Sequence, residues 1–281
     1  MKFTSTRNLL LLLITNYSLL IISCSPNNVK TDESLKKYFD ENHVTGTFGL
    51  YDNGTGQFII YNLSRFKDSA YLPASTFKIV NSLIGIETGR IVNEKMVIKW
   101  DGVVRTFPNG DTATAWNKDL SMEEAFKASA VPYYQEVARR IGKDTMQRWL
   151  DSLKYGTKKI TTEVDHFWLD NSLKITPDEE MGLVKKLYFG QLPFQKRTQD
   201  IVKKVMLQEN NANYKLSYKT GLGFRENGNE LGWIVGWIEE NKHPYFFVLN
   251  IEGSHDTKMT SLRLNILKAI LKQQDFFEGK R

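Results

Sequence analysis

The chain has 281 residues, of which 41% are hydrophobic and 25% are charged. This composition fits one large globular domain or two closely packed lobes, and it excludes a disordered or fibrous protein. The formal net charge of +6 is modest, and the basic residues are spread along the chain without forming a run. Nucleic-acid binding therefore has little support. A mildly positive cleft for a small anionic molecule remains compatible with this charge.

The N-terminus has the pattern of a signal peptide. Lys2 and Arg7 precede an apolar stretch at residues 9–22, which is too short and interrupted for a comfortable bilayer span. The small residue and Cys24 that follow resemble the lipobox of bacterial lipoproteins, in which the cysteine is lipidated and becomes the new N-terminus. The alternative is an ordinary signal peptide that leaves a free cysteine.

We therefore predict three parts of the chain: a signal peptide over residues 1–23, a polar tether over residues 24–35, and one domain over residues 36–281. A lipidated Cys24 would make the protein a membrane-anchored lipoprotein in the periplasm of a Gram-negative bacterium.

Cysteine and histidine usage argues against metal or thiol chemistry. Cys24 is the only cysteine, so the exported domain has no internal disulfide and no thiol nucleophile. The four histidines are scattered and show no metal-ligand spacing, so we expect no metal site and disfavour a zinc hydrolase. They are His43, His166, His243 and His255.

The first expected structure is a β-hairpin, in which Thr47–Tyr51 and Gln57–Asn62 flank a turn that contains Asn53-Gly54. A helical pattern then runs from Ser75 to Thr88. Residues 99–208 are helical and loop-rich, and the late chain returns to strands before a final helix. Helical spacing occurs in Met122–Ala130, Tyr133–Ile141, Asp144–Leu153 and Thr260–Lys272, and the late strands are expected at Tyr214–Thr220, Leu231–Ile238 and Tyr245–Ile251.

This order predicts an α+β fold. Strands at both ends of the chain would form one antiparallel sheet, and the helices between them would form an inserted lobe. A cleft between sheet and lobe is a common place for a small-molecule site. The absence of repeated βαβ units disfavours a doubly wound nucleotide-binding fold.

Ser75-Thr76-Phe77-Lys78 is the first candidate for chemistry. Serine and lysine three residues apart share one face of a helix, and a neutral amine within reach can take the proton of a serine hydroxyl. The start of the helix also offers backbone N–H groups to an oxyanion. Alone, this pattern is weak, because a capping serine followed by an exposed lysine gives the same spacing.

Lys219-Thr220-Gly221 supplies the second element, on a predicted late strand. Glycine lets a ligand approach the backbone closely, and lysine adds positive charge. An S-x-x-K at a helix start followed by K-T-G on a late strand is the signature of serine β-lactamases and penicillin-binding proteins.

The third element is Ser129-Ala130-Val131, which stands where other classes have S-D-N. Here the chain resembles class D (oxacillinase-type) serine β-lactamases, which have S-x-V at this place, followed by Tyr134-Gln135 and by the A-R-x-I-G pattern at residues 138–142. The resemblance extends from about Lys36 to Lys272. Further matching stretches are Lys78–Gly89, Phe167–Leu169, Gly232–Trp237 and Leu262-Arg263.

The resemblance implies hydrolysis of β-lactam antibiotics, and thereby resistance, on a serine β-lactamase and penicillin-binding-protein-like fold. Ser75 would be the nucleophile, and Lys78 would be carboxylated to N6-carboxylysine and act as general base. Carbon dioxide or bicarbonate would be the only co-reactant, because no cofactor or metal is needed. Burial favours this modification, since it disfavours the ammonium form of lysine.

The resemblance also implies roles for the other site residues. Ser129 would relay a proton to the departing lactam nitrogen, and the backbone N–H groups of Ser75 and Leu222 would form the oxyanion hole. The indole N–H of Trp168 would donate to the carbamate. The pocket around Lys78 would consist of Phe77, Val131, Trp168 and Leu169, and the substrate carboxylate would bind Lys219 and Arg263, with Thr220 and Gly221 beside it.

Several of these residues have plainer explanations. Phe77 and Val131 alone would be core residues, and Ser129 could stabilise a turn. Arg263 on a final helix could be a solvated charge, and the pair Trp233 and Trp237 is best explained as sheet packing.

Two positions depart from the class D pattern. The Y-G-N triplet of the family appears as Tyr155-Gly156-Thr157, which puts any role of its asparagine in doubt. The residue after K-T-G is commonly aromatic, but here it is Leu222, which alters one wall of the cleft. A backbone contact at this position should survive that change.

Three other functions stay open. A β-lactam sensor uses the same domain but stays acylated, and it carries a multi-span membrane region upstream that 23 residues before Cys24 cannot supply. A penicillin-binding transpeptidase would share Ser75, Lys78 and Lys219 but deacylate slowly. A lipoprotein with an inactive site is disfavoured, because the residues for each step are present. The expected partners are small β-lactams and a lipid anchor, and the sequence does not reveal the oligomeric state.

Overall fold

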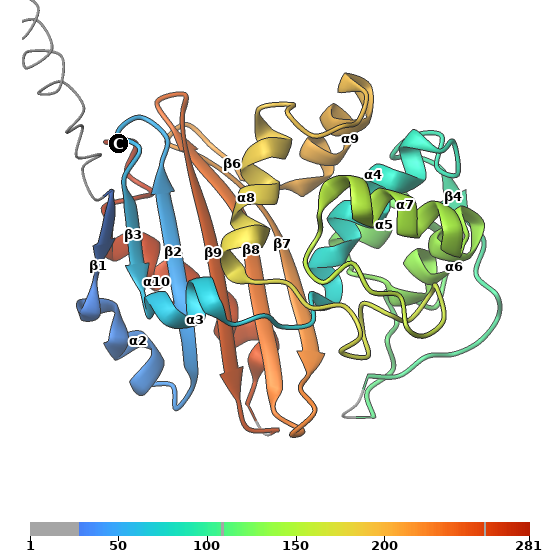
Figure 1. Ribbon diagram of the computed structural model, residues 1–281, viewed down its shortest axis with the longest axis horizontal. Coiled ribbons are helices and arrows are strands. Elements are labelled where there is room, and N and C mark those ends of the chain that lie inside the picture. Colours follow the sequence, from blue (N-terminus) through green and yellow to red (C-terminus); the bar gives the residue numbers. More distant parts are fainter. Residues whose placement is uncertain (1–27, 108–109, 256) are drawn as a thin grey trace, which may run out of the picture.

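The computed structural model describes residues 28–107, 110–255 and 257–281 (Figure 1). The predicted signal peptide and Cys24 lie outside these residues. The main sheet has seven strands in the order β1-β3-β2-β9-β8-β7-β6. These strands are β1 (Val29–Thr31), β2 (Thr45–Asp52), β3 (Phe58–Tyr61), β6 (Leu207–Asn210), β7 (Lys215–Phe224), β8 (Glu230–Glu240) and β9 (His243–Gly253); β4 (Val97–Ile98) and β5 (Leu120–Ser121) form a separate pair.

The sheet confirms the predicted α+β fold, because the N-terminal hairpin joins the late strands. Strand β2 pairs antiparallel with both β3 and β9, which brings residues 45–52 beside residues 245–252. The sheet is antiparallel except at one edge, where β1 pairs parallel with β3. A three-residue strand that reaches the edge from outside the hairpin can pair in either direction.

The same edge corrects the expected tether. Residues 29–31 are part of the sheet, and Leu35 is fully buried beside Phe39. The polar character of the segment hid this, since only every third residue, at positions 29, 32 and 35, is removed from solvent. Residues 29–35 thus belong to the folded unit and not to a tether.

The helices lie on both faces of the sheet. Helices α2 and α10 cover one face, and α8 with the helical lobe lies on the other face and beside β7 (Figure 1). No helix in the described part of the chain is both long and apolar enough to cross a membrane. The α-helices are α2 (Lys36–Asp40), α3 (Leu63–Asp68), α4 (Lys78–Glu87), α5 (Met122–Lys127), α6 (Val131–Ile141), α7 (Lys143–Leu153), α8 (Pro177–Tyr188), α9 (Lys196–Met206) and α10 (Met259–Gln273); 3-10 turns are η2 (Glu33–Leu35) and η3 (Ala74–Phe77).

The helix expected to begin at Ser75 is split in the structure. Residues 74–77 form the 3-10 turn η3, and α4 begins only at Lys78. Ala74 has a positive φ of 49°, so the chain enters this turn through a conformation that non-glycine residues rarely adopt. Ser75 therefore sits in a tight turn ahead of the α-helix and not on its first turn.

Two apolar cores hold the sheet between the helices. One face of β8 carries Trp233, Val235 and Trp237 toward α8 and the lobe, and the other carries Ile234 and Ile238 toward α10. This alternation explains why the strand reads as an almost continuous hydrophobic run. It also confirms the expected packing role of the two tryptophans, which are buried.

Two glycines offer a matched test of this packing. A Cβ at Gly236 would lie 2.0 Å from the backbone oxygen of Ser217 on the neighbouring strand, whereas a Cβ at Gly182 within α8 would have no neighbour within 4 Å. We expect Gly236→Ala to lower the free energy of unfolding by about 3 kcal/mol, because backbone cannot yield. Gly182→Ala should raise it by about 0.5–1 kcal/mol through reduced backbone entropy. Denaturant titration measures both changes, and equal stability of the two variants would contradict the register described here.

Candidate active site

The structure brings Ser75 and Lys78 into direct contact at the junction of η3 and α4. Lys78 Nζ donates a hydrogen bond to Ser75 Oγ at 2.6 Å. Lys78 is fully buried, whereas Ser75 retains 7% of its exposure. A serine so placed can be reached by a small substrate while its neighbouring amine stays out of water.

The amine of Lys78 lies in an apolar enclosure. The ring of Tyr134 lies 5.6 Å from Nζ, and the neighbouring Phe77 is fully buried. Burial lowers the pKa of Lys78 to about 7. Desolvation destabilises the ammonium form, so a large fraction of this lysine is a neutral amine at neutral pH.

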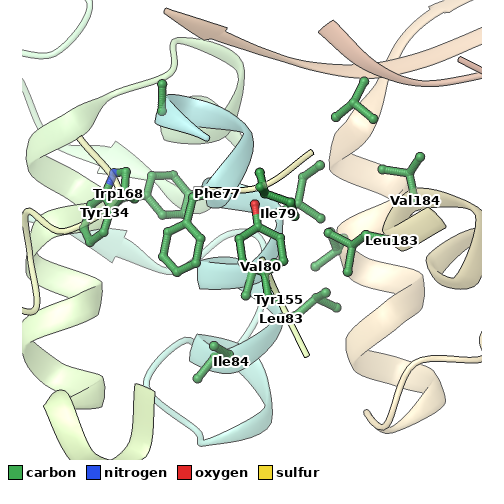
Figure 2. Close-up of a cluster of buried hydrophobic side chains, with 14 of the residues drawn as sticks. Phe77, Ile79, Val80, Leu83, Ile84, Tyr134, Tyr155, Trp168, Leu183 and Val184 are labelled. Atoms are coloured by element: carbon green, nitrogen blue, oxygen red, sulfur yellow. The ribbon is translucent and has the colours of Figure 1, made fainter. Parts of the chain in front are cut away.

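The residues predicted to form the pocket around Lys78 differ in burial. Phe77 and Trp168 are fully buried and stack with ring centroids 5.3 Å apart, whereas Val131 and Leu169 are half-buried. Figure 2 shows Phe77 beside Trp168, with Tyr134 on the same side of the cluster. Val131 begins α6, and Leu169 follows Trp168 directly.

Trp168 carries an unsatisfied polar atom in this pocket. Its indole Nε1 is buried and has no hydrogen-bond partner among the described residues. A buried donor without an acceptor costs about 1–3 kcal/mol. An acceptor group introduced here would remove that cost.

Lys219 and Ser129 form a second polar contact between β7 and the helical lobe. Lys219 Nζ donates to Ser129 Oγ at 3.0 Å and to the backbone oxygen of Thr220 at 2.9 Å. Ser129 has a positive φ of 54° in the turn between α5 and α6, which presents its hydroxyl to β7. Burial, followed by the charges of Lys78 and Arg263, holds the pKa of Lys219 well below its ordinary value.

Arg263 is buried against the strand that carries Lys219. Its guanidinium donates to the backbone oxygen of Gly221, and its Nε has no partner among the residues described. Burial lowers its pKa to about 10, so it remains a cation at neutral pH. The plainer prediction of a solvated charge was therefore wrong. Thr220 and Leu222 are half-buried beside it.

Strand β7 runs close to the turn that bears Ser75. A Cβ at Gly221 would lie 3.0 Å from the backbone oxygen of Pro73 and 3.3 Å from Thr76 Cγ2. Glycine thus permits a close contact between strand and turn, and the close approach of a ligand that was expected of it stays a prediction. Leu222 follows on the same strand.

Comparisons with known proteins agree with this geometry. The model of the penicillin-binding protein transpeptidase domain matches residues 31–272. The β-lactamase OXA-48 of Klebsiella pneumoniae is 39% identical over 243 residues, which cover 86% of this chain and 88% of the relative. The crystal structure of a class D β-lactamase from Sebaldella termitidis superposes with a TM-score of 0.82 at 33% identity, covering 89% of this chain and 98% of that one.

The chain belongs to the class D serine β-lactamases. This confirms the family predicted from Ser75, Lys78, Lys219 and the S-x-V element. Enzymes of this class need no metal, and no group of three or more metal-ligating side chains occurs within the described ranges.

The fold alone does not separate this class D β-lactamase from a receptor. The C-terminal domain of the BlaR penicillin receptor of Bacillus licheniformis superposes with a TM-score of 0.82 at 28% identity, covering 90% of this chain and 98% of that one. The sequence identities to β-lactamases are higher.

One departure from the class D pattern has a clear structural role. The hydroxyl of Thr157 accepts a hydrogen bond from the backbone N–H of Lys174, and the Thr157 N–H donates to the Lys174 oxygen. Thr157 therefore ties this loop to the segment that precedes α8.

Sequence reasoning missed one residue at this site. Glu180 on α8 is fully buried and bonds to Thr76, the residue after the serine. It follows Asp178 and Glu179, and an acidic run in the first turn of a helix is typical of a solvated N-terminus. No signal in that run distinguishes the one carboxyl that turns inward.

Proposed function

We propose that this class D β-lactamase hydrolyses β-lactam antibiotics through an acyl-enzyme on Ser75, with carboxylated Lys78 as the general base, and that it thereby confers resistance. The observation that carries the proposal is the buried Lys78 amine 2.6 Å from Ser75 Oγ. The Trp168 N–H, which finds no acceptor among the residues that the structure describes, lies in the adjoining apolar cluster. A neutral amine can take up CO2, and a carbamate there would give the Trp168 N–H an acceptor.

The residues present fit that modification. The pKa of Lys78 leaves the amine largely neutral above about pH 7, as reaction with CO2 requires. The carbamate would supply the base that takes the Ser75 proton during acylation and activates the water during deacylation. Phe77, Trp168, Val131 and Leu169 would keep bulk water away from it.

The other side chains would handle the substrate. Ser75 Oγ bonds to the lactam carbonyl carbon, the carbon–nitrogen bond breaks, and Ser129 passes a proton to the departing nitrogen. Lys219, which contacts Ser129, would hold the substrate carboxylate together with Arg263, and Thr220 and Gly221 lie beside it. The backbone N–H groups of Ser75 and Leu222 would stabilise the oxyanion.

We further propose that the chain is exported by a signal peptide over residues 1–23 and anchored in the periplasm of a Gram-negative bacterium through a lipidated Cys24. Support comes from the basic head, the short apolar stretch and the small residue before the cysteine. The domain that follows would begin near Val29, where the sheet begins.

The function is tested by turnover in the presence and absence of bicarbonate. We expect the domain to hydrolyse a chromogenic cephalosporin over many cycles, to lose activity after decarboxylation at mildly acidic pH, and to regain it with added bicarbonate. The loss of activity in acid follows from the lowered pKa of Lys78. Below about pH 7 the ammonium form dominates and cannot hold CO2. A single stoichiometric burst without further turnover in bicarbonate would instead indicate a receptor or a transpeptidase.

Removal of the Lys78 amine should stop the reaction between acylation of Ser75 and hydrolysis of the acyl-enzyme. We expect Lys78→Ala to trap the acyl-enzyme and to lower kcat by about 10³-fold, because the water that must attack the acyl-enzyme loses its base. Mass spectrometry after mixing with penicillin measures the trapped species. Lys99→Ala, at a lysine whose amine pairs with Asp119 at the surface, is the control. Normal turnover by Lys78→Ala would remove this lysine from the mechanism.

Lipidation is tested on the protein as the cell makes it. We expect mass spectrometry of the membrane fraction to find a diacylglyceryl group on Cys24, and Cys24→Ser to move the enzyme to the soluble fraction. An unmodified Cys24 in a soluble mature protein would contradict the anchor but leave the activity proposal intact.

A further inference from the structure

Glu180 joins three parts of the molecule beneath the catalytic turn. It lies in the first turns of α8, which begins with a Thr176–Glu179 capping box. Its Oε1 lies 2.6 Å from Thr76 Oγ1 and 2.8 Å from the hydroxyl of Tyr155, which follows α7. Its Oε2 is buried and has no hydrogen-bond partner in the described ranges. Figure 2 shows Tyr155 within the same buried cluster as Leu183 of α8.

Thr76 transmits this contact to the serine. Its hydroxyl also lies 2.8 Å from the backbone oxygen of Pro73, and its N–H donates to that same oxygen at 3.1 Å. These two bonds close the turn that carries Ser75. The methyl group of Thr76 also approaches Gly221, so a change at Thr76 reaches both the serine and β7.

Counting protons shows which form of Glu180 fits these contacts. Three short contacts join Pro73, Thr76, Glu180 and Tyr155, and the two hydroxyl groups supply only two protons. With an ionised Glu180, one pair of oxygens would face each other without a hydrogen. With a protonated Glu180, the carboxyl donates to Thr76, Thr76 donates to Pro73, and Tyr155 donates to the carboxyl. Every contact is then a hydrogen bond.

Within the part of the chain that the structure describes, no positively charged group acts on the Glu180 carboxyl, and only hydrogen bonds from Thr76 and Tyr155 favour its ionised form. Glu180 is fully buried, and the groups that act on it are Thr76, Tyr155 and the like-charged Glu179. Strand β9 presents apolar side chains to this core. The charged side chains on and around α8 contact other residues. Lys67 on α3 acts on Asp178, and Lys185 of α8 lies over the ring of Tyr51 on β2. Glu239 on β8 and Lys203 on α9 both contact Tyr188.

We propose that Glu180 is a positioning residue that must carry a proton, and that it fixes the Ser75 turn by donating a hydrogen bond to Thr76. The proposal rests on Ser75 being the nucleophile, as set out above. Ionisation turns the Thr76 hydroxyl from Pro73 toward the carboxylate, and the turn loses one of its two closing bonds. Ser75 then moves away from the position in which it contacts Lys78 and lies beside β7, and acylation slows.

Burial raises the pKa of Glu180 to about 7, so the proton is lost just above neutral pH. Hydrogen bonds with Thr76 and then Tyr155 act in the opposite direction and lower this pKa. Tyr155 itself stays protonated, because burial and the nearby carboxyl raise its pKa well above the ordinary value. We therefore expect activity to fall above about pH 7 as this carboxyl loses its proton.

The first test compares the pH dependence of acylation in wild type and Glu180→Gln at saturating bicarbonate. The amide is permanently neutral and donates to Thr76 as the protonated acid does. We expect kcat/KM of the wild type to fall by up to about tenfold for each pH unit above about 7. Glu180→Gln should keep its neutral-pH value there. Glu41→Gln, at an exposed carboxyl beside α2, is the control and should retain the wild-type profile. The same alkaline fall in Glu180→Gln would overturn the proposal.

A second variant moves the titration without removing the carboxyl. Tyr155→Phe deletes a bond that favours the ionised form, so the alkaline fall should shift to higher pH. In the Glu180→Gln background the same change should leave the profile flat. A shift of equal size in both backgrounds would assign the effect to packing and refute the role of the proton.

Infrared spectroscopy detects the proton on the Glu180 carboxyl independently of any activity measurement. We expect a carbonyl band of an un-ionised carboxyl in the wild type at pH 6 that disappears by pH 9 and is missing from Glu180→Gln. Its absence from the wild type at pH 6 would overturn the proposal even in an active enzyme. A protein that shows the band and acylates but does not turn over would instead contradict only the proposed hydrolysis.

Discussion

The contact between a buried amine and a serine hydroxyl is the interaction on which this site depends. Lys78 loses the hydration of its ammonium form, and the hydroxyl beside it gains a group able to take its proton. A surface lysine at the same spacing would be a cation and could do neither. The chemistry follows from burial, since the residue types alone are common.

The fold supplies that burial from two directions. The sheet places β7, with Lys219 and Gly221, along one side of the turn that bears Ser75. The lobe supplies the aromatic residues on the other side, from segments far apart in the sequence. Because Arg263 reaches β7 from the opposite face of the sheet, the positive charges gather at one strand. Strand β7 therefore lies between the proposed substrate-binding cations and the Ser75 turn.

The sequence predicted the parts of the site that carry motifs, and it missed those that depend on three-dimensional packing. Ser75, Lys78 and Lys219 have fixed spacings, and the late strands have clear alternation, so both were found. The 3-10 turn at Ala74 and the parallel edge strand at Val29 leave no such pattern, because their conformations are set by contacts with distant segments. Glu180 shows the limit most clearly: adjacent to a capping glutamate, it differs only in the side to which it points.

Burial shifts the pKa values of two groups at this site toward neutral pH from opposite directions, lowering that of Lys78 and raising that of Glu180. Both shifts reduce the stability of the folded state. Lys78 must release a proton on folding, so its contribution is least favourable below about pH 7 and improves as pH rises toward its ordinary pKa. Glu180 must keep a proton, so its contribution worsens as pH rises from its ordinary pKa to about 7. Each shift corresponds to a few kcal/mol at roughly 1.4 kcal/mol per pKa unit. Both penalties are therefore present at neutral pH, where an apolar pair would have none. The proposed uptake of CO2 by the Lys78 amine would offset the first penalty, since CO2 reacts only with the neutral form. The penalty at Glu180 has no such compensation. The protonated carboxyl instead donates its hydrogen bond to Thr76, in the turn that holds Ser75.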